Sequence, residues 1–304
     1  MSTGAAARIS ALLQNSTIAK LERLRLQPRL KRTARGRGEH LAGKGGSSTD
    51  FADYRDYAVG DDLRFVDWNA FARLQRPYLK TFRMEEERHL LIIIDASRSM
   101  RFEGKLAQAK RLAAAFAVVA MTANERVSVW APGAVPGNRV LPPTRGRQAV
   151  RRALSAIEAI PDEASGATIE RAIELALARH SGRGSALVLS DYLGDSLGDG
   201  GLKGAFNRLS GAGLELMAVQ ILAPIELDPQ LLGDLRLVDS ESGVALDVSA
   251  AGDALGLYHE HRQRWSATVE AWCTGRGGRF LACSSEDAID TLLFERMRRL
   301  GWLA

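Results

Sequence analysis

Cysteine and long apolar runs are scarce in this chain of 304 residues. Its two cysteines, Cys273 and Cys283, cannot form a disulfide framework and lack metal-ligand spacing. The longest apolar run, LAAAFAVVAM at 112–121, is too short to span a bilayer and predicts a buried helix. The first residues, MSTGAAARISALLQNSTIAK, contain no continuous apolar stretch of the secretory-signal type. We therefore expect a cytoplasmic protein without a membrane span.

Motifs of several hydrolytic enzymes are also missing. GKGGSS at 43–48 is rich in glycine but lacks the spacing of an ATP-binding P-loop. The serines that follow the apolar strands do not form the G-x-S-x-G nucleophile elbow. His259 and His261 lie two positions apart on a predicted helix, so they face different sides and do not form a metal pair. We expect no catalytic residue and a protein that is not an enzyme.

The chain has an ordinary globular composition with an uneven distribution of charge. Hydrophobic residues make up 46% and charged residues 25%, which allows a large core. The net charge is +5, and nine Lys or Arg side chains in 20–44 face only Glu22 and Glu39. Such a segment could contact nucleic acid or an acidic protein surface, but a solvated helix and loop is the simpler interpretation. No aromatic side chains alternate with the basic ones to stack on bases.

Three stretches differ in pattern. Residues 1–49 form a basic segment with helical spacing followed by a Gly-rich loop, and 50–88 are rich in aromatic and charged residues. From 89 to 304, apolar runs of strand length alternate with helical patterns, which indicates a parallel sheet buried on both faces. We expect an α/β fold with a doubly wound, mostly parallel central sheet, helices on both faces and a β-hairpin insertion near 234–249.

Oxygen-bearing side chains occur where the predicted strands end. In LLIIIDASRSM, Asp95, Ser97 and Ser99 follow a buried strand. Thr168 opens a later helix, and Asp191 ends another apolar strand. Hard oxygen donors of this kind suit Mg²⁺ or Mn²⁺ and not zinc, which prefers nitrogen or sulfur. The carboxyl edge of such a sheet is also the expected place for a ligand.

This D-x-S-x-S pattern, with a distant threonine and a second aspartate, resembles the metal-ion-dependent adhesion site of von Willebrand factor A domains. The resemblance implies that Ser97, Ser99 and Thr168 coordinate the ion directly or nearly so. It also implies that Asp95 and Asp191 act through water, and that one coordination position stays open for a partner's carboxylate. The implied cofactor is Mg²⁺ or Mn²⁺.

A second resemblance rests on the segment before that site. The core pattern Y-R-x-Y-x-x-G-D-D-x-R-x-x-D-W-x-x-x-A-R, then an acidic stretch and the D-x-S-x-S strand, is similar to the signature of the bacterial family catalogued as domain of unknown function 58. That resemblance implies a partnership with a MoxR-type AAA+ ATPase or with its client. The matching residues are Tyr54, Arg55, Tyr57, Gly60, Asp61, Asp62, Arg64, Asp67, Trp68, Ala72 and Arg73.

Other interpretations stay open at this point. The serines and Thr168 could simply cap helices. Asp61 suits a turn and Trp68 a core anchor, so 50–88 could be structural, packing on the core, although it could also be a docking face. We expect a metal-dependent protein-binding module, with a metal-assisted hydrolase and nucleic-acid binding through 20–44 as alternatives.

Overall fold

The structure is a computed structural model that describes most of the chain. The described residues are 9–27, 51–82, 88–162, 168–193, 201–229, 235–238, 243, 245–248 and 251–304. The chain divides into two compact units. One joins Met1–Leu30 with Arg88–Ala304, and the other is Lys31–Glu87. Most of the predicted basic segment 20–44 lies outside the described residues.

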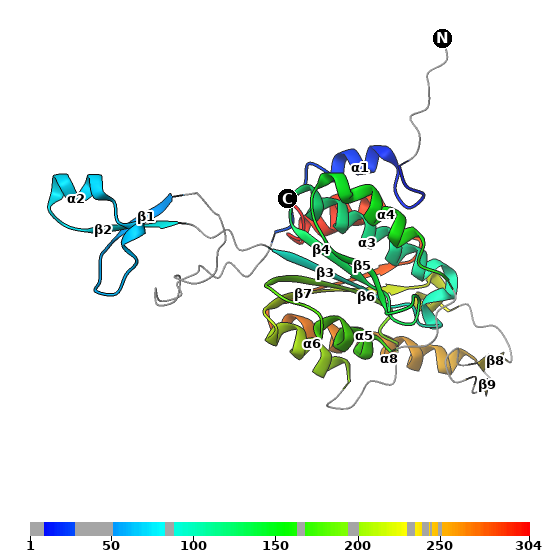
Figure 1. The fold of residues 1–304 in the computed structure, drawn as a ribbon. Coiled ribbons are helices and arrows are strands. Elements are labelled where there is room, and N and C mark those ends of the chain that lie inside the picture. Colours follow the sequence, from blue (N-terminus) through cyan, green and yellow to red (C-terminus); the bar gives the residue numbers. More distant parts are fainter. Residues whose placement is uncertain are drawn as a thin grey trace, which may run out of the picture. The chain divides into compact units, whose positions relative to one another are not determined.

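The larger unit is built on a six-stranded sheet (Figure 1). Its strands lie in the order β10-β7-β6-β3-β4-β5, and every neighbouring pair is parallel except β4 with β5. The predicted mixed α/β fold with a mostly parallel central sheet is thereby confirmed. The strands are β3 (His89–Ile94), β4 (Arg126–Trp130), β5 (Arg139–Thr144), β6 (Gly184–Ser190), β7 (Leu214–Leu222) and β10 (Arg279–Ser284).

Helices cover both faces of this sheet (Figure 1). One face carries α1 (Asn15–Leu21), α3 (Lys105–Thr122), α4 (Val150–Glu158) and η4 (Thr291–Met297). The other carries α5 (Ile169–Leu177), α6 (Leu202–Gly211) and α8 (Ala251–Thr274). Short helical turns complete the unit: η2 (Ser99–Gly104), η3 (Arg147–Ala149) and α7 (Pro224–Leu227).

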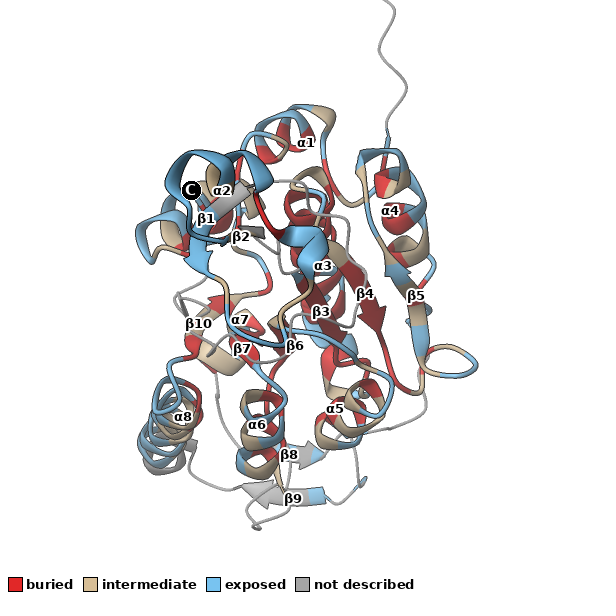
Figure 2. Ribbon diagram, turned by 60° about the vertical axis from the view of Figure 1, so that its left-hand side comes forward, coloured by how far each residue is buried: buried red, intermediate tan, exposed pale blue. Residues whose placement is uncertain are grey.

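The central strand β3 shows why the apolar runs do not alternate with polar residues. Leu90, Ile92 and Ile94 belong to the core on the α3 face, whereas Leu91 and Ile93 belong to the core on the α5 face. Successive side chains of a strand point to opposite faces, so a strand covered on both sides must be apolar throughout. All six residues of β3 are buried, and the burial continues into α3 (Figure 2).

The exceptions to parallel pairing lie outside the centre of the sheet. Strand β5 pairs antiparallel with β4 and carries Pro142 and Pro143, which lack a backbone N–H and are tolerated on an edge strand. The hairpin expected near 234–249 is present as β8 (Leu235–Val238) and β9 (Ala245–Val248), which pair antiparallel.

The N-terminal segment of the larger unit is part of its core. Leu13, Ile18 and Leu21 are buried in the cluster that contains α3. The backbone N–H of Arg25 donates to the Ala304 carbonyl at 2.9 Å, and the Ala304 N–H returns the bond at 3.0 Å. The described part of the predicted segment 1–49 thus belongs to the α/β unit.

The smaller unit pairs β1 (Phe51–Asp56) antiparallel with β2 (Tyr78–Phe82), and between them lie η1 (Leu63–Phe65) and α2 (Trp68–Leu74). Asp67 caps α2 by accepting from the N–H groups of Asn69 and Ala70, and it also accepts from the Tyr54 hydroxyl. These bonds, with the Ala70 N–H first, lower the pKa of Asp67 to about 2. Arg55 forms a two-bond ion pair with Asp61. Tyr54, Arg55, Asp61 and Asp67, all residues of the signature pattern, therefore hold this small unit together.

Trp68 differs from that pattern. Its side chain is 59% exposed, so it is not buried within its own small unit, and its role as an anchor on the core stays a prediction. Its ring contacts Phe71 edge to face, at 6.1 Å between centroids. Whether 50–88 packs on the α/β unit remains a prediction.

The order of the strands creates a switch point in the sheet between β3 and β6. Of the strands in this sheet, β3 comes first along the chain and lies between β4 and β6. The chain adds β4 and β5 on one side of β3 and then crosses over to add β6 and β7 on the other side. In doubly wound sheets the loops diverge at this switch point and leave a crevice at the carboxyl edge. Asp95 follows β3 and Asp191 follows β6, so the two aspartates lie at that switch point.

A buried histidine lies at the opposite, amino end of β3. His89 Nε2 is 2.9 Å from Ser128 Oγ, and the His89 ring stacks on His180 at 4.8 Å between centroids. Burial, the neighbouring His180 and then Arg126 lower the pKa of His89 to about 4. Arg139 and Arg179 line the same small cavity. The folded protein therefore disfavours the charged form of His89.

We predict that the protein loses stability through His89 as the pH falls. The pKa is depressed on folding, so this contribution is complete above the unfolded value of 6.5 and is lost as the pH falls through about 4. The loss is on the order of 3 kcal/mol. Urea unfolding across this range should give a shallower acid loss for His89→Gln than for wild type. His261→Gln, which changes an exposed histidine, should keep the wild-type slope, and equal slopes for all three proteins would refute the assignment.

Candidate functional site

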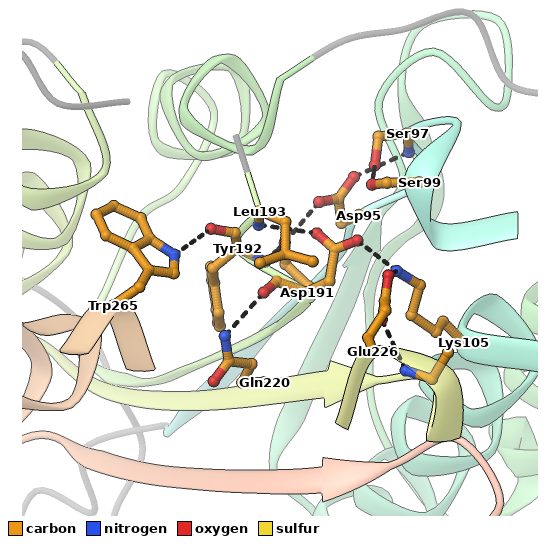
Figure 3. Close-up of polar contacts among 12 residues, drawn as sticks. Asp95, Ser97, Ser99, Lys105, Asp191, Tyr192, Leu193, Gln220, Glu226 and Trp265 are labelled. Carbon is orange, nitrogen blue, oxygen red and sulfur yellow. Dashed lines mark hydrogen bonds and ion pairs between the residues drawn. The ribbon is translucent and has the colours of Figure 1, made fainter. Parts of the chain in front are cut away.

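The turn after β3 positions the first three predicted residues. Asp95 is buried, and its Oδ1 accepts from the backbone N–H of Ser97 at 2.9 Å (Figure 3). The hydroxyl of Ser190, the last residue of β6, donates to Asp95 Oδ2 at 2.6 Å. The Oγ atoms of Ser97 and Ser99 lie 3.1 Å apart. The Asp95 carboxylate thus fixes the turn and leaves two half-buried hydroxyls close together above it.

A second tight turn follows β6. Asp191 is buried, and its Oδ1 accepts from the Leu193 N–H at 3.1 Å. The intervening Tyr192 has φ +56°, a left-handed conformation that is unfavourable for a bulky side chain. Its N–H donates to Ser190 Oγ, and its hydroxyl donates to the Val188 carbonyl. These bonds hold the strained turn that aims Asp191 back at the edge of the sheet.

Lys105 is the cation of this site, and its side chain is completely buried. Its Nζ lies 2.8 Å from Asp191 Oδ2 and 2.6 Å from Glu226 Oε1 (Figure 3). Lys105 is also the first residue of α3, where the helix dipole disfavours a positive charge. The two carboxylates must therefore compensate both the dipole and the desolvation of the ammonium group.

Glu226 extends the site toward the C-terminal helices. Its second oxygen, Oε2, accepts from the Ala223 N–H at 2.7 Å, and its backbone carbonyl accepts from the Tyr258 hydroxyl of α8. The buried Gln220 donates to the Asp191 carbonyl at 3.0 Å and accepts from Ser266 of α8 at 2.8 Å. The position of Asp191 is thus coupled to β7, α7 and α8.

The site carries excess negative charge. Asp95, Asp191 and Glu226 contribute three carboxylates, and Lys105 contributes one ammonium group. Burial, and then the charge of Asp191, raise the pKa of Asp95 to about 6. With every group ionised, two negative charges remain. A divalent cation would balance them.

Thr168 is placed differently from the other four predicted residues. It is exposed and caps α5, where its hydroxyl accepts from the Arg171 N–H at 3.4 Å. Helix α5 precedes the parallel strand β6 and packs on β3, so its first residue lies at the carboxyl edge. Among the described residues, no hydrogen bond joins Thr168 to the other four. The structure brings together Asp95, Ser97, Ser99 and Asp191 and places Thr168 at the same edge, in the role of a helix cap.

The donor set fits a hard divalent ion. In the part of the chain that the structure describes, no three His, Cys, Asp or Glu side chains converge as metal ligands. An ion at this edge would therefore be held partly by hydroxyl oxygens and water, as Mg²⁺ and Mn²⁺ allow. Ser97 and Ser99 would supply the hydroxyls, and the carboxylates of Asp95 and Asp191 would supply charge from behind them.

Three residues of the site were missed in the sequence: Lys105, Ser190 and Glu226. The one available signal was Lys105, a cation in the first turn of a long apolar helix, where an acid or a cap is expected. Ser190 is hidden by its neighbour Asp191. Glu226 lies in a segment without an obvious motif, and only the ends of β6 and β7 bring it near.

The fold and the site define a class: an α/β protein with an oxygen-rich, negatively charged crevice at the switch point of a parallel sheet. A family model described as "Protein of unknown function DUF58" matches residues 53–267. The chain belongs to this family, and the expectation from the segment 50–88 is confirmed at that level.

Relatives and solved structures with similarity to the chain were also found. Uncharacterized proteins of Mycobacterium bovis and Mycobacterium tuberculosis are each 27% identical over 279 residues, which is 88% of this chain and 85% of theirs. A conserved hypothetical protein BatB from Bacteroides thetaiotaomicron has 14% identity and a TM-score of 0.43, covering 70% of this chain and 98% of its own. An aerotolerance-related membrane protein from Bacteroides fragilis has 17% identity and a TM-score of 0.45, covering 70% and 99%. In this chain, no helix among the described residues has the length and hydropathy needed to cross a membrane.

We predict that Lys105→Met strongly destabilises the protein. The substitution leaves Asp191 and Glu226 close together without their cation, at a cost of roughly 3–5 kcal/mol in the free energy of unfolding. Adding Asp191→Asn and Glu226→Gln to Lys105→Met should recover much of that loss, because the three substituted side chains are then all neutral. Urea unfolding at neutral pH measures all of these variants.

A matched control is Lys203→Met, which removes an exposed lysine from α6 and should change stability by less than about 0.5 kcal/mol. If Lys105→Met behaves like Lys203→Met, the ammonium group does not stabilise this edge of the sheet.

Proposed function

We propose that this protein is a metal-dependent protein-binding module. In this proposal Mg²⁺ or Mn²⁺ binds at Ser97 and Ser99, with Asp95 and Asp191 behind them and Thr168 completing the set. The ion then captures a carboxylate from a partner protein. The observation that carries the proposal is the pair of adjacent hydroxyls above two buried carboxylates at the switch point.

The arrangement agrees with a von Willebrand factor A-like domain, the resemblance drawn from the sequence. The mostly parallel sheet with one antiparallel edge strand, and the placement of Asp95 and Asp191 after adjacent strands, are the supporting features. A divalent charge in a partly dry crevice attracts a carboxylate much more strongly than it would in water, because the local dielectric is low.

The raised pKa of Asp95 does not favour the hydrolase alternative. Near-neutral pKa values are typical of catalytic acids, but here burial and the charge of Asp191 account for the shift. A bound divalent ion would favour the ionised carboxylate and reverse it. Burial also raises the pKa of both thiols, Cys273 and Cys283, to about 12, so neither is a reactive nucleophile.

The partner is proposed from the family resemblance. We take it to be a MoxR-type AAA+ ATPase, or a client that such an ATPase remodels, with this protein as its adaptor. Nucleic-acid binding through 20–44 gains no support from the described residues: Lys20 pairs with Asp290 at 3.1 Å. A cytoplasmic location remains a prediction from sequence.

We predict opposite effects of Asp95→Asn on stability and on the response to metal. The pKa of Asp95 is raised on folding from 3.8 to about 6, so in the absence of metal its favourable contribution is complete below 3.8 and is lost as the pH rises through about 6. At neutral pH, metal-free Asp95→Asn should therefore be more stable than wild type, by up to roughly 3 kcal/mol. The amide keeps the size of the carboxyl group and can still accept from the Ser97 N–H.

The same variant should respond less to metal. At ten times its dissociation constant, Mg²⁺ should stabilise wild type by about 1.4 kcal/mol, which raises the melting temperature by a few degrees relative to chelator. Asp95→Asn and the double variant Ser97→Ala/Ser99→Ala should show little of that rise. Thermal unfolding with Mg²⁺, with Mn²⁺ and with chelator measures this, and a wild type unaffected by either ion would contradict the site.

We predict that binding to the ATPase requires the metal. A purified MoxR-type ATPase of the same organism should bind wild type in millimolar Mg²⁺ and lose most of that binding with chelator or with Ser97→Ala/Ser99→Ala. Lys203→Met should bind as wild type does. Binding that survives both chelator and the double variant would exclude the carboxylate-capture mechanism.

A further inference from the structure

A shallow groove of about 640 Å³ lies beside the candidate metal site. It is lined by residues that follow β3, β7 and β10: Glu103, Pro224, Ile225, Asp228 and Glu286. Three of the five are acids, and the other two are apolar. The groove therefore combines negative charge with an apolar wall.

Two short stretches of chain connect the groove to the candidate metal site. Glu103 is in the same short helical segment, η2, as Ser99, at a kink formed by Phe102 and Glu103. Ile225 precedes Glu226, which accepts from Lys105 at 2.6 Å. Glu103 is four positions after Ser99, so their Cα atoms lie at most about 14 Å apart. One extended peptide could therefore reach both the site and the groove.

Exposed apolar side chains surround this edge. Phe102 after β3, Leu193 after β6 and Ile225 after β7 are 46%, 40% and 41% exposed. Each follows a different strand of the same sheet at its carboxyl end, where Leu193 lies next to the Asp191 turn (Figure 3). Such side chains suit the contact area of a protein partner.

The charge of the groove opposes that of the whole chain. The protein has a net charge of +5, yet this surface carries Glu103, Asp228 and Glu286. The nearby Arg296 is engaged by Asp287 and the Ala282 carbonyl. His259 Nε2 is 4.0 Å from Asp228 Oδ1 and adds charge only when it is protonated. Charge complementarity selects a basic occupant.

We infer that the groove binds a Lys or Arg side chain, with an adjacent apolar residue, from the same partner segment whose carboxylate reaches the metal. This inference rests on the proposed function and specifies the partner's chemistry. The recognised segment carries an Asp or Glu, an apolar residue and a Lys or Arg within about four positions, the span of an extended chain between Ser99 and Glu103.

The test is a selection of random peptides displayed on phage, made on the full chain in millimolar Mg²⁺. Enriched peptides should combine an acidic residue with a basic and an apolar residue inside that span. A second selection uses the double variant Glu103→Lys/Glu286→Lys, and a third uses wild type with chelator. Synthetic copies of the enriched peptides should bind the double variant roughly tenfold more weakly than wild type.

The outcomes separate the inference from the proposed function. Acidic enrichment that needs Mg²⁺, without basic enrichment, would overturn the groove inference and leave the metal site intact. Basic and apolar enrichment that disappears on the double variant but persists with chelator would support the groove and reject metal capture. No enrichment on wild type would overturn both.

Two controls keep the test independent of folding. Glu270→Lys reverses an exposed acid near the end of α8, at the amino edge of the sheet, and should leave the selected peptides unchanged. Thermal unfolding of the double variant should match wild type, since Glu103 and Glu286 are both exposed. If Glu270→Lys weakens the peptides as much as the double variant does, the effect is one of net charge and the inference fails.

Discussion

The buried ammonium group of Lys105 constrains the whole carboxyl edge of the sheet. A charge taken out of water is costly unless its partners are close and well oriented, and Asp191 and Glu226 meet that need from two different strand ends. Removing either carboxylate would leave the ammonium group under-compensated. The lysine therefore ties the end of β6 and the start of α7 to the first turn of α3, and the remaining parts of the site are built around that connection.

The same interaction divides the negative charge of the crevice into two parts. Asp191 and Glu226 face the lysine, whereas Asp95 is held by neutral donors, the Ser190 hydroxyl and the Ser97 N–H. Burial, and then the charge of Asp191, raise the pKa of Asp95, and the bonds from Ser190 and Ser97 offset only part of that rise. A site that is destabilising when empty gains more from an occupant that neutralises it, and residues that cost stability are commonly those that function requires.

Local patterns in the sequence predict much of this edge, because a strand and the turn after it are encoded by neighbouring residues. Apolar runs that end in oxygen-bearing side chains are enough to assign four residues to the candidate site: Asp95, Ser97, Ser99 and Asp191. Thr168 could be placed at the start of a helix, and the structure shows it as a cap. Lys105 and Glu226 could not be paired, because their contact depends on the order of strands in the sheet. The exposure of Trp68 was likewise unpredictable, because an aromatic residue in a small charged unit can be buried or left for a partner.

The residues of the crevice come from widely separated parts of the chain, and this has a kinetic consequence. Asp95 meets Ser190 across 95 positions, and Lys105 meets Glu226 across 121. Parallel pairing of such distant segments is slow, because the entropy of closing long loops is lost before any contact compensates for it. On the ribosome, the crevice cannot form until β7 and α7 have been synthesised. A partner that recognises this edge therefore recognises only chains in which the centre of the sheet has already folded.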